Sequence, residues 1–84
     1  MDVRDGLNFK DRLLRVFREE FKDSALDERV NAETYAAWDS LAHIRLLIAI
    51  EREFSFEPTA EEIAETYSDF PTLLQVIVRA AARR

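Results

Sequence analysis

Hydrophobic residues near the N-terminus recur at the spacing of one helix face. They stand about 3.6 residues apart, with basic residues mostly between them: Phe9, Leu13, Leu14, Val16, Phe17 and Phe21. Asn8, with Asp11 three residues later, forms an approximate capping box in which a short acid replaces the usual Glu or Gln. The spacing predicts a first helix over residues 9–22.

Residues 22–39 lose this periodicity and are rich in Asp, Ser and Asn, whose side chains compete for backbone hydrogen bonds. A connection of this length is uncommon in a compact domain unless it is functional or held by anchors of its own. Leu26, Val30 and Tyr35 have the spacing of such anchors, with a short helical turn near residues 31–35. Trp38 is expected to fix the end of the loop in the core.

A second helix is predicted over residues 40–54, capped by Asp39 or Ser40, which are both favoured N-cap residues. At about 100° per residue, its apolar positions share one arc that is expected to face the core: Ile44, Leu46, Leu47, Ile50 and Phe54. Glu51 falls inside this arc, where an ionised carboxylate needs a partner or a route to water.

A different stripe of the same helix combines apolar and cationic residues, and we expect it to meet partner proteins. Its members recur at helical spacing: Leu41, Arg45, Ile48 and Arg52. His43, one turn past Ser40, is assigned to this partner face, where it would contact a bound phosphate or a partner. The alternatives are that the arginines only solvate the helix and that His43 is a surface residue without a role.

Two further helices are predicted in the C-terminal third. Thr59 and Glu62 form a full capping box for a short third helix over residues 59–67, with a core face of Ala60, Ile63, Ala64 and Tyr67. Pro71 suits the first position of a fourth helix over residues 71–82. Its expected buried side is Leu73, Leu74, Ile77, Val78 and Ala81, and Arg79, Arg83 and Arg84 complement its C-terminal dipole.

No strand pattern competes with these helices. The expected fold class is therefore all-α: one domain over residues 1–84, built as a four-helix bundle with a short third helix and a long loop between the first two helices. The 84 residues carry a formal charge of −5, which disfavours nucleic-acid binding and suits basic protein partners. The apolar run over residues 46–50 is too short to span a bilayer, and the start lacks the features of a signal peptide, so we expect a cytoplasmic monomer.

Ser40 has the most distinctive chemical setting in the chain. Asp39, Ser40 and His43 could be written as a catalytic triad, but they lie along one helical turn with no nucleophile elbow and nothing to supply an oxyanion hole. The chain has no cysteine, and a single histidine cannot build a metal site, so we expect no catalysis by the chain itself. A modification of Ser40 is favoured instead, because an anionic group there would meet the positive end of a helix. The alternative is that Ser40 only caps the helix.

The stretch over residues 38–54, with Trp-Asp-Ser-Leu at its start and Glu-Arg-Glu-Phe at its end, resembles the signature of the acyl carrier protein family. The likeness extends over about residues 7–82. It implies that a separate phosphopantetheinyl transferase moves 4′-phosphopantetheine from coenzyme A to Ser40, whose arm then carries acyl groups as thioesters between loading and processing enzymes. By position, Asp39 and Leu41 would help the transferase to recognise its substrate.

The second helix departs from the family in charge. Many members carry acids along it, whereas this chain has His43, Arg45 and Arg52 there, which predicts specialised partners. Fatty-acid, polyketide, aminoacyl or peptidyl cargo all stay open, as does a non-enzymatic interaction module in which Ser40 is only a cap. Four alanines would leave room for cargo between the second and third helices or serve close packing: Ala42, Ala49, Ala60 and Ala64.

Overall fold

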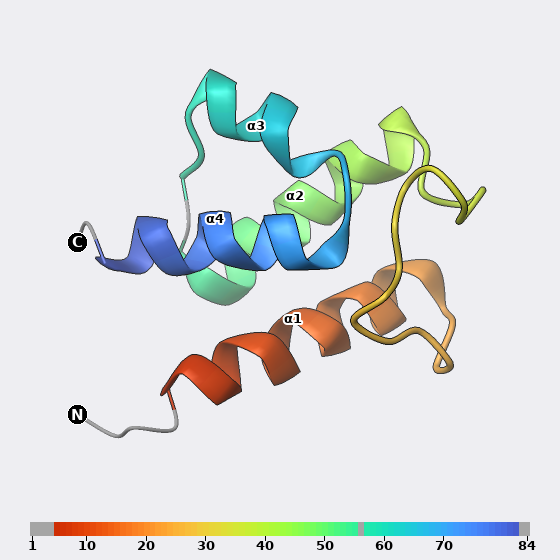
Figure 1. Cartoon of the computed structure of the whole chain (residues 1–84), viewed down its shortest axis with the longest axis horizontal. Coiled ribbons are helices and arrows are strands. Elements are labelled where there is room, and N and C mark those ends of the chain that lie inside the picture. Colours follow the sequence, from red (N-terminus) through yellow and green to blue (C-terminus); the bar gives the residue numbers. More distant parts are fainter. Residues whose placement is uncertain (1–4, 56, 83–84) are drawn as a thin grey trace.

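The computed structural model describes residues 5–55 and 57–82, with side chains from residue 9 onward. Four helices are present in this part of the chain: α1 (Asp5–Phe21), α2 (Ser40–Phe54), α3 (Ala60–Thr66) and α4 (Phe70–Ala82) (Figure 1). The described residues contain no strand beyond one isolated bridge between Asn31 and Asp69. The predicted all-α bundle is therefore confirmed. Within the described residues, no helix has the length and apolarity needed to cross a membrane.

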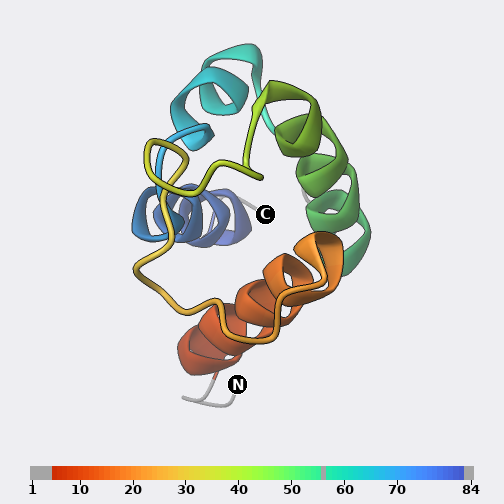
Figure 2. The ribbon, with the colours of Figure 1, turned by 90° about the vertical axis from the view of Figure 1, so that its right-hand side faces the viewer.

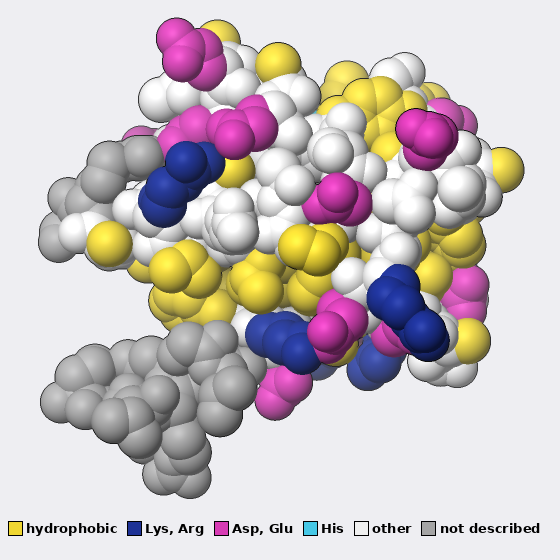
Figure 3. Space-filling model, in the orientation of Figure 1, with side chains coloured by type: hydrophobic (Ala, Val, Ile, Leu, Met, Phe, Trp, Pro, Cys, Tyr) yellow, Lys and Arg dark blue, Asp and Glu magenta, His cyan; other side chains and the backbone are white. Residues whose placement is uncertain are grey.

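The helices surround a common interior, as the end-on view in Figure 2 shows. Helix α1 packs against both α2 and α4, while α3 packs against α4. On the face drawn in Figure 3, hydrophobic side chains follow the boundary between α1 and α4, with charged side chains on either side. The long loop over residues 22–39 crosses one end of the bundle and delivers the chain to the start of α2.

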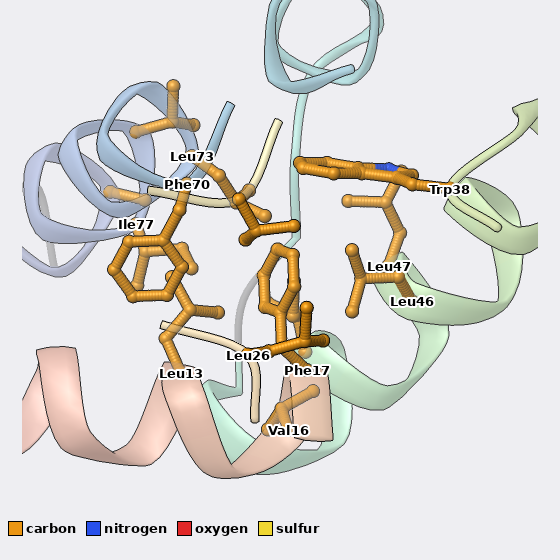
Figure 4. Close-up of a cluster of buried hydrophobic side chains, with 14 residues drawn as sticks. Leu13, Val16, Phe17, Leu26, Trp38, Leu46, Leu47, Phe70, Leu73 and Ile77 are labelled. Atoms are coloured by element: carbon orange, nitrogen blue, oxygen red, sulfur yellow. The ribbon is translucent and has the colours of Figure 1, made fainter. Parts of the chain in front are cut away.

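Phe17 on α1 lies at the centre of the core (Figure 4). Its ring makes edge-to-face contacts with Trp38 at 5.1 Å and with Phe70 at 5.4 Å between centroids, which is a favourable arrangement of aromatic rings. Aliphatic side chains from α1, α2 and α4 fill the space around these rings: Leu13, Val16, Leu46, Leu47, Ile50, Leu73, Val76 and Ile77. One ring thus connects the first helix, the end of the loop and the last helix.

Charged and aromatic contacts join α1 to the C-terminal end of α2. The Arg12 guanidinium donates to a Glu53 carboxylate oxygen at 2.7 Å and lies 4.6 Å from the centre of the Phe54 ring. Arg15 donates to the same carboxylate oxygen at 2.9 Å. The hydrogen bond from Arg12, with the charge of Arg15, lowers the pKa of Glu53 below its ordinary value.

Helix α1 begins at Asp5, so the predicted start after Asn8 is wrong. The Asn8–Asp11 pair lacks the long acid or amide of a true capping box, so it does not mark the start of the helix. The helix ends at Phe21 because Lys22 takes a left-handed conformation, with φ of 53°. The Asp23 N–H then donates to the Arg18 carbonyl at 3.0 Å, as in a Schellman motif.

The loop anchors were predicted correctly. Leu26 and Val30 are buried, and Tyr35 packs against the core while its hydroxyl donates to Asp23 at 2.9 Å. The expected turn is present, since the Tyr35 N–H donates to the Asn31 carbonyl at 3.0 Å. Trp38 is buried, as expected.

Backbone hydrogen bonds tie the loop to the connection between α3 and α4. The Phe70 N–H donates to the Val30 carbonyl at 3.0 Å, and the Ala32 N–H donates to the Ser68 carbonyl at 2.7 Å. The loop is therefore held by main-chain pairing as well as by its buried side chains.

The predicted core face of α2 is displaced around the helix. Its buried residues are Ala42, His43, Leu46, Leu47 and Ile50. Ile44 is 56% exposed, so its assignment to the core was wrong. Phe54 is half-buried, and Glu51 is exposed, which gives its carboxylate the route to water that it needs. Ala42 and His43 are buried although neither is a large apolar residue, so the hydrophobic pattern did not assign them to the core.

Helix α3 has the predicted capping box, because the Thr59 hydroxyl and N–H exchange hydrogen bonds with the Glu62 N–H and carboxylate. Its predicted core face is wrong. Glu62 and Thr66 are buried, whereas the four residues assigned to the core are exposed: Ala60, Ile63, Ala64 and Tyr67. The two inward polar side chains have hydrogen-bond partners, which offsets the cost of burying them.

Helix α4 begins one residue earlier than predicted, at Phe70, so Pro71 is its second residue. The Asp69 carboxylate accepts from the Thr72 N–H at 2.8 Å and caps this end. Leu73 and Ile77 are buried and Leu74 is half-buried, but Val78 is exposed and Ala81 is only half-buried. Arg79 lies 3.4 Å from Glu65 of α3. Arg83 and Arg84 lie outside the described residues.

Leu73 and Val78 on α4 test this placement, since Leu73 is 0% exposed and Val78 is 41% exposed. We expect Leu73→Ala to lower the free energy of unfolding by about 2–5 kcal/mol, because it removes core contacts and leaves a cavity. Val78→Ala should change it by no more than about 0.5 kcal/mol. Urea denaturation followed by Trp38 fluorescence measures both, and equal losses would contradict the observed orientation of α4.

Candidate modification site

Ser40 is the first residue of α2, and its side chain is exposed. The residue before it, Asp39, has an extended backbone and caps the helix: its carboxylate accepts from the Ala42 N–H at 2.8 Å. The Asp39 carbonyl accepts from the His43 N–H at 2.8 Å. Of the two predicted caps, the structure therefore selects Asp39, and the alternative that Ser40 serves as the cap is wrong.

The Ser40 hydroxyl is left without a hydrogen bond among the described residues. Asp39 and Leu41, on either side of it, are exposed as well, so the three residues form one accessible corner at the start of α2. The Ser40 and Leu41 N–H groups belong to the first turn of the helix and have no intrahelical acceptor. The positive end of the helix dipole therefore lies at this corner.

Behind this corner, a buried chain of hydrogen bonds connects the end of the loop, α2 and α3. The Trp38 indole N–H donates to Nδ1 of His43 at 3.1 Å, and Nε2 of His43 lies 3.1 Å from the Thr66 hydroxyl. The Thr66 hydroxyl donates to the Ile63 carbonyl at 2.9 Å. An indole N–H can only donate, so His43 accepts at Nδ1 and carries its proton on Nε2, which donates to Thr66.

Tyr67 covers this cluster. Its ring stacks on the His43 imidazole at 5.0 Å between centroids, and its hydroxyl donates to the Trp38 carbonyl at 3.3 Å. Burial lowers the pKa of His43 below its ordinary value, and the Ile63 carbonyl opposes this shift only in part. His43 is therefore a neutral interior side chain near pH 7.

The assignment of His43 to the partner face is wrong, because its side chain is buried between Trp38 and Thr66. The sequence did hold a signal for this. With Asp39 as the cap, Trp38 and His43 occupy the two positions of a hydrophobic staple, which bring side chains together across a helix start. Thr66, by contrast, is remote in sequence and carries no such signal.

The arrangement does not form a Ser–His–Asp triad. Both ring nitrogens of His43 are occupied by Trp38 and Thr66, and the Asp39 carboxylate is bound to a backbone N–H. No base therefore reaches the Ser40 hydroxyl from these residues.

The rest of the predicted partner face lies on the surface. Leu41, Arg45, Ile48 and Arg52 are all exposed, and Ile44 adds to the same side of α2. Arg45 lies 3.6 Å from Glu20 of α1, so part of its charge is balanced within the molecule. The structure thus brings three exposed aliphatic side chains together with two arginines.

Of the four alanines that would leave room for cargo or serve close packing, Ala42 is buried and Ala49 half-buried, whereas Ala60 and Ala64 of α3 are exposed. An open cleft of about 570 Å³ lies between the loop and the start of α4, lined by Glu28, Arg29, Asn31, Glu33, Thr34, Ser68, Asp69 and Pro71. Ser40 does not line it. In the described part of the chain, no group of acidic or histidine side chains is arranged to hold a metal ion.

Comparison with known proteins gives no relative. No protein-family model matches the chain, and neither a curated protein nor a solved structure matches it significantly.

Asp39 allows a test of the cap. Asp39→Ala should lower the free energy of unfolding by about 1 kcal/mol, because the Ala42 N–H loses its acceptor. Asp39→Asn keeps an acceptor oxygen and should lose much less. Urea denaturation with circular dichroism measures both variants, and an equal loss would show that the hydrogen bond is not what Asp39 contributes.

His43 makes stability depend on pH. A histidine in the unfolded chain takes up a proton near pH 6.5, whereas the buried ring does so only at lower pH. Between those two pKa values the unfolded chain binds more protons, so the free energy of unfolding should fall as the pH drops below about 6.5. His43→Gln cannot titrate and should flatten this slope between pH 5.5 and about 7. Denaturation midpoints over that range measure the effect, and an equal slope in both proteins would contradict it.

Proposed function

We propose that this protein is a carrier whose Ser40 hydroxyl bears 4′-phosphopantetheine and, through it, acyl groups as thioesters. The observation that carries the proposal is an exposed serine hydroxyl at the first position of a 15-residue helix, left free because the neighbouring Asp39 makes the cap. The Asp-Ser-Leu sequence at this corner is the reason to choose this modification rather than another.

Accessibility supports the proposal. An enzyme that modifies Ser40 must reach its oxygen in line with the group to be transferred. Asp39, Ser40 and Leu41 are all exposed, and no described residue hydrogen-bonds to the hydroxyl. The acceptor oxygen is therefore presented without any intramolecular bond to break.

Electrostatics support it as well. A phosphodiester on Ser40 would lie beside the N–H groups of the first helical turn and the positive end of the dipole of α2. The Asp39 carboxylate, which accepts from the Ala42 N–H, adds a negative charge at the same corner and opposes part of this attraction. We therefore expect the modified chain to keep the fold of the unmodified one.

The chemistry would come from a separate transferase. The Ser40 oxygen would form a bond to the β-phosphorus of coenzyme A while the pyrophosphate bond breaks and adenosine 3′,5′-bisphosphate leaves. The proton of the hydroxyl must go to a base of that enzyme, because His43 is bound on both ring nitrogens. Among its own residues, this chain contributes the acceptor oxygen and the recognition corner of Asp39 and Leu41.

The loading and processing enzymes would then meet the exposed side of α2. This surface combines three aliphatic residues with two arginines: Leu41, Ile44, Ile48, Arg45 and Arg52. Such a surface suits partners with an apolar contact and acidic groups at its rim. We therefore favour a specialised acyl pathway over standard fatty-acid synthesis.

The test is transfer of one phosphopantetheine group. Incubation with coenzyme A, Mg²⁺ and a broad-specificity phosphopantetheinyl transferase should raise the intact mass by one such group, and Ser40→Ala should abolish the gain. Ser24→Ala, at an exposed serine of the loop, is the matched control and should be modified like the wild type.

A wild-type chain that stays unmodified with several transferases would contradict the proposal. It would favour a non-enzymatic interaction module, in which Ser40→Ala changes nothing. Because Asp39 makes the cap, we expect Ser40→Ala to unfold at nearly the wild-type denaturant concentration in either case.

A further inference from the structure

The interior beside Ser40 contains a polar cluster in otherwise apolar surroundings. Trp38, His43 and Thr66 are 1%, 4% and 0% exposed, yet each polar side-chain atom has a partner. The three side chains come from the end of the loop, from α2 and from α3. A buried network in which every group is satisfied stiffens the elements that it joins.

The two neighbours of His43 select one form of its ring. The Trp38 indole presents a donor, and the Thr66 hydroxyl gives its own proton to the Ile63 carbonyl. The residue between them must therefore accept on one side and donate on the other. Neutral histidine with its proton on Nε2 does both.

The cluster holds the first turn of α2 from both sides. Trp38 stands two residues before Ser40 and His43 three residues after it, and both are fixed to α3 through Thr66 and Tyr67. The backbone of Ser40 is thus the middle of a short segment whose two ends are tied to the interior. Its position depends on bonds that Ser40 does not itself make.

We propose that His43 is a positioning residue for the modification of Ser40: it holds the start of α2 against α3, and protonation of its ring releases that hold. This inference rests on the proposed function, because the reaction it controls is transfer to Ser40. His43 acts through the backbone of the helix and does not touch the transferred group.

Protonation would break the network for a simple reason. A protonated ring carries an N–H on both nitrogens, so Nδ1–H would face the Trp38 N–H, and two donors cannot bond to each other. Burial already lowers the pKa of the ring, which keeps the bonded neutral form dominant near pH 7.

Among the described residues no carboxylate hydrogen-bonds to the ring, and burial is the largest influence on its pKa. From the preceding turn, the Asp39 carboxylate is bound to the Ala42 N–H, and from α3 the Glu62 carboxylate accepts the Thr59 N–H. The Tyr67 phenol stacks on the ring with its hydroxyl turned to the Trp38 carbonyl. From α1, the rings of Phe17 and Phe21 pack against Trp38.

The chain offers unambiguous spectroscopic reporters, since it has a single histidine and a single tryptophan. In a ¹⁵N-labelled sample, His43 should show the Nε2–H tautomer at pH 7.5, and the Trp38 indole N–H should exchange slowly with solvent. As the pH falls, both signals should change together. A ring that titrates near pH 6.5 while the indole signal stays constant would overturn the inference.

Transfer kinetics then separate positioning from general stability. Thr66→Val keeps the side-chain shape but removes the hydroxyl, and should lower kcat/KM for transfer to Ser40 about fivefold at pH 7.5, the factor that corresponds to one lost hydrogen bond. Thr66→Ser restores the hydroxyl and should recover the rate to within about twofold. Ile77→Val weakens the core away from the cluster and should leave the rate of the folded protein unchanged.

The pH dependence of the transfer rate distinguishes a positioning role of His43 from a purely structural one. The ratio of wild-type to His43→Phe rates, taken at each pH with the same transferase, should shrink as the pH falls, because Phe cannot accept from Trp38 at any pH and the protonated wild-type ring loses the same bond. A constant ratio, or equal rates for Thr66→Val and Ile77→Val, would overturn the inference alone. A wild-type chain that is never modified would overturn the proposed function and this inference with it.

Discussion

The buried indole of Trp38 holds this small domain together at the point where its long loop ends. The ring packs edge-to-face on Phe17 of α1, and its N–H donates to His43 of α2. The backbone carbonyl of Trp38 accepts from the Tyr67 hydroxyl, just after α3. An indole N–H inside a protein needs an acceptor. That requirement places the histidine, and the histidine in turn places Thr66 and α3.

The helices and the loop could be predicted from local patterns, whereas the inward faces of two helices could not. Periodicity selects large apolar residues, so it assigned Ile44 and Ile63 to the core, and both are exposed. The inward face of α3 is polar because its partners lie elsewhere: His43 satisfies Thr66, and the backbone before the helix satisfies Glu62. Such pairing exists only after the chain has folded, so no pattern within α3 contains it.

The candidate site was predicted in position but not in its internal organisation. The Asp-Ser-Leu corner at a helix start follows from the sequence, yet the choice between Asp39 and Ser40 as cap needed the backbone geometry. The surroundings of His43 needed more, because Thr66 lies 23 residues further along the chain. Only the spacing of Trp38 and His43 across the cap pointed toward an interior histidine.

Asp39 and Ser40 differ in what they contribute to the start of α2: one caps the helix and the other is an exposed side chain. The Asp39 carboxylate stabilises this helix start, whereas the Ser40 hydroxyl makes no hydrogen bond within the described residues. The side chain at residue 40 can therefore be exchanged without loss of a capping bond, so the helix start places little constraint on which residue stands there.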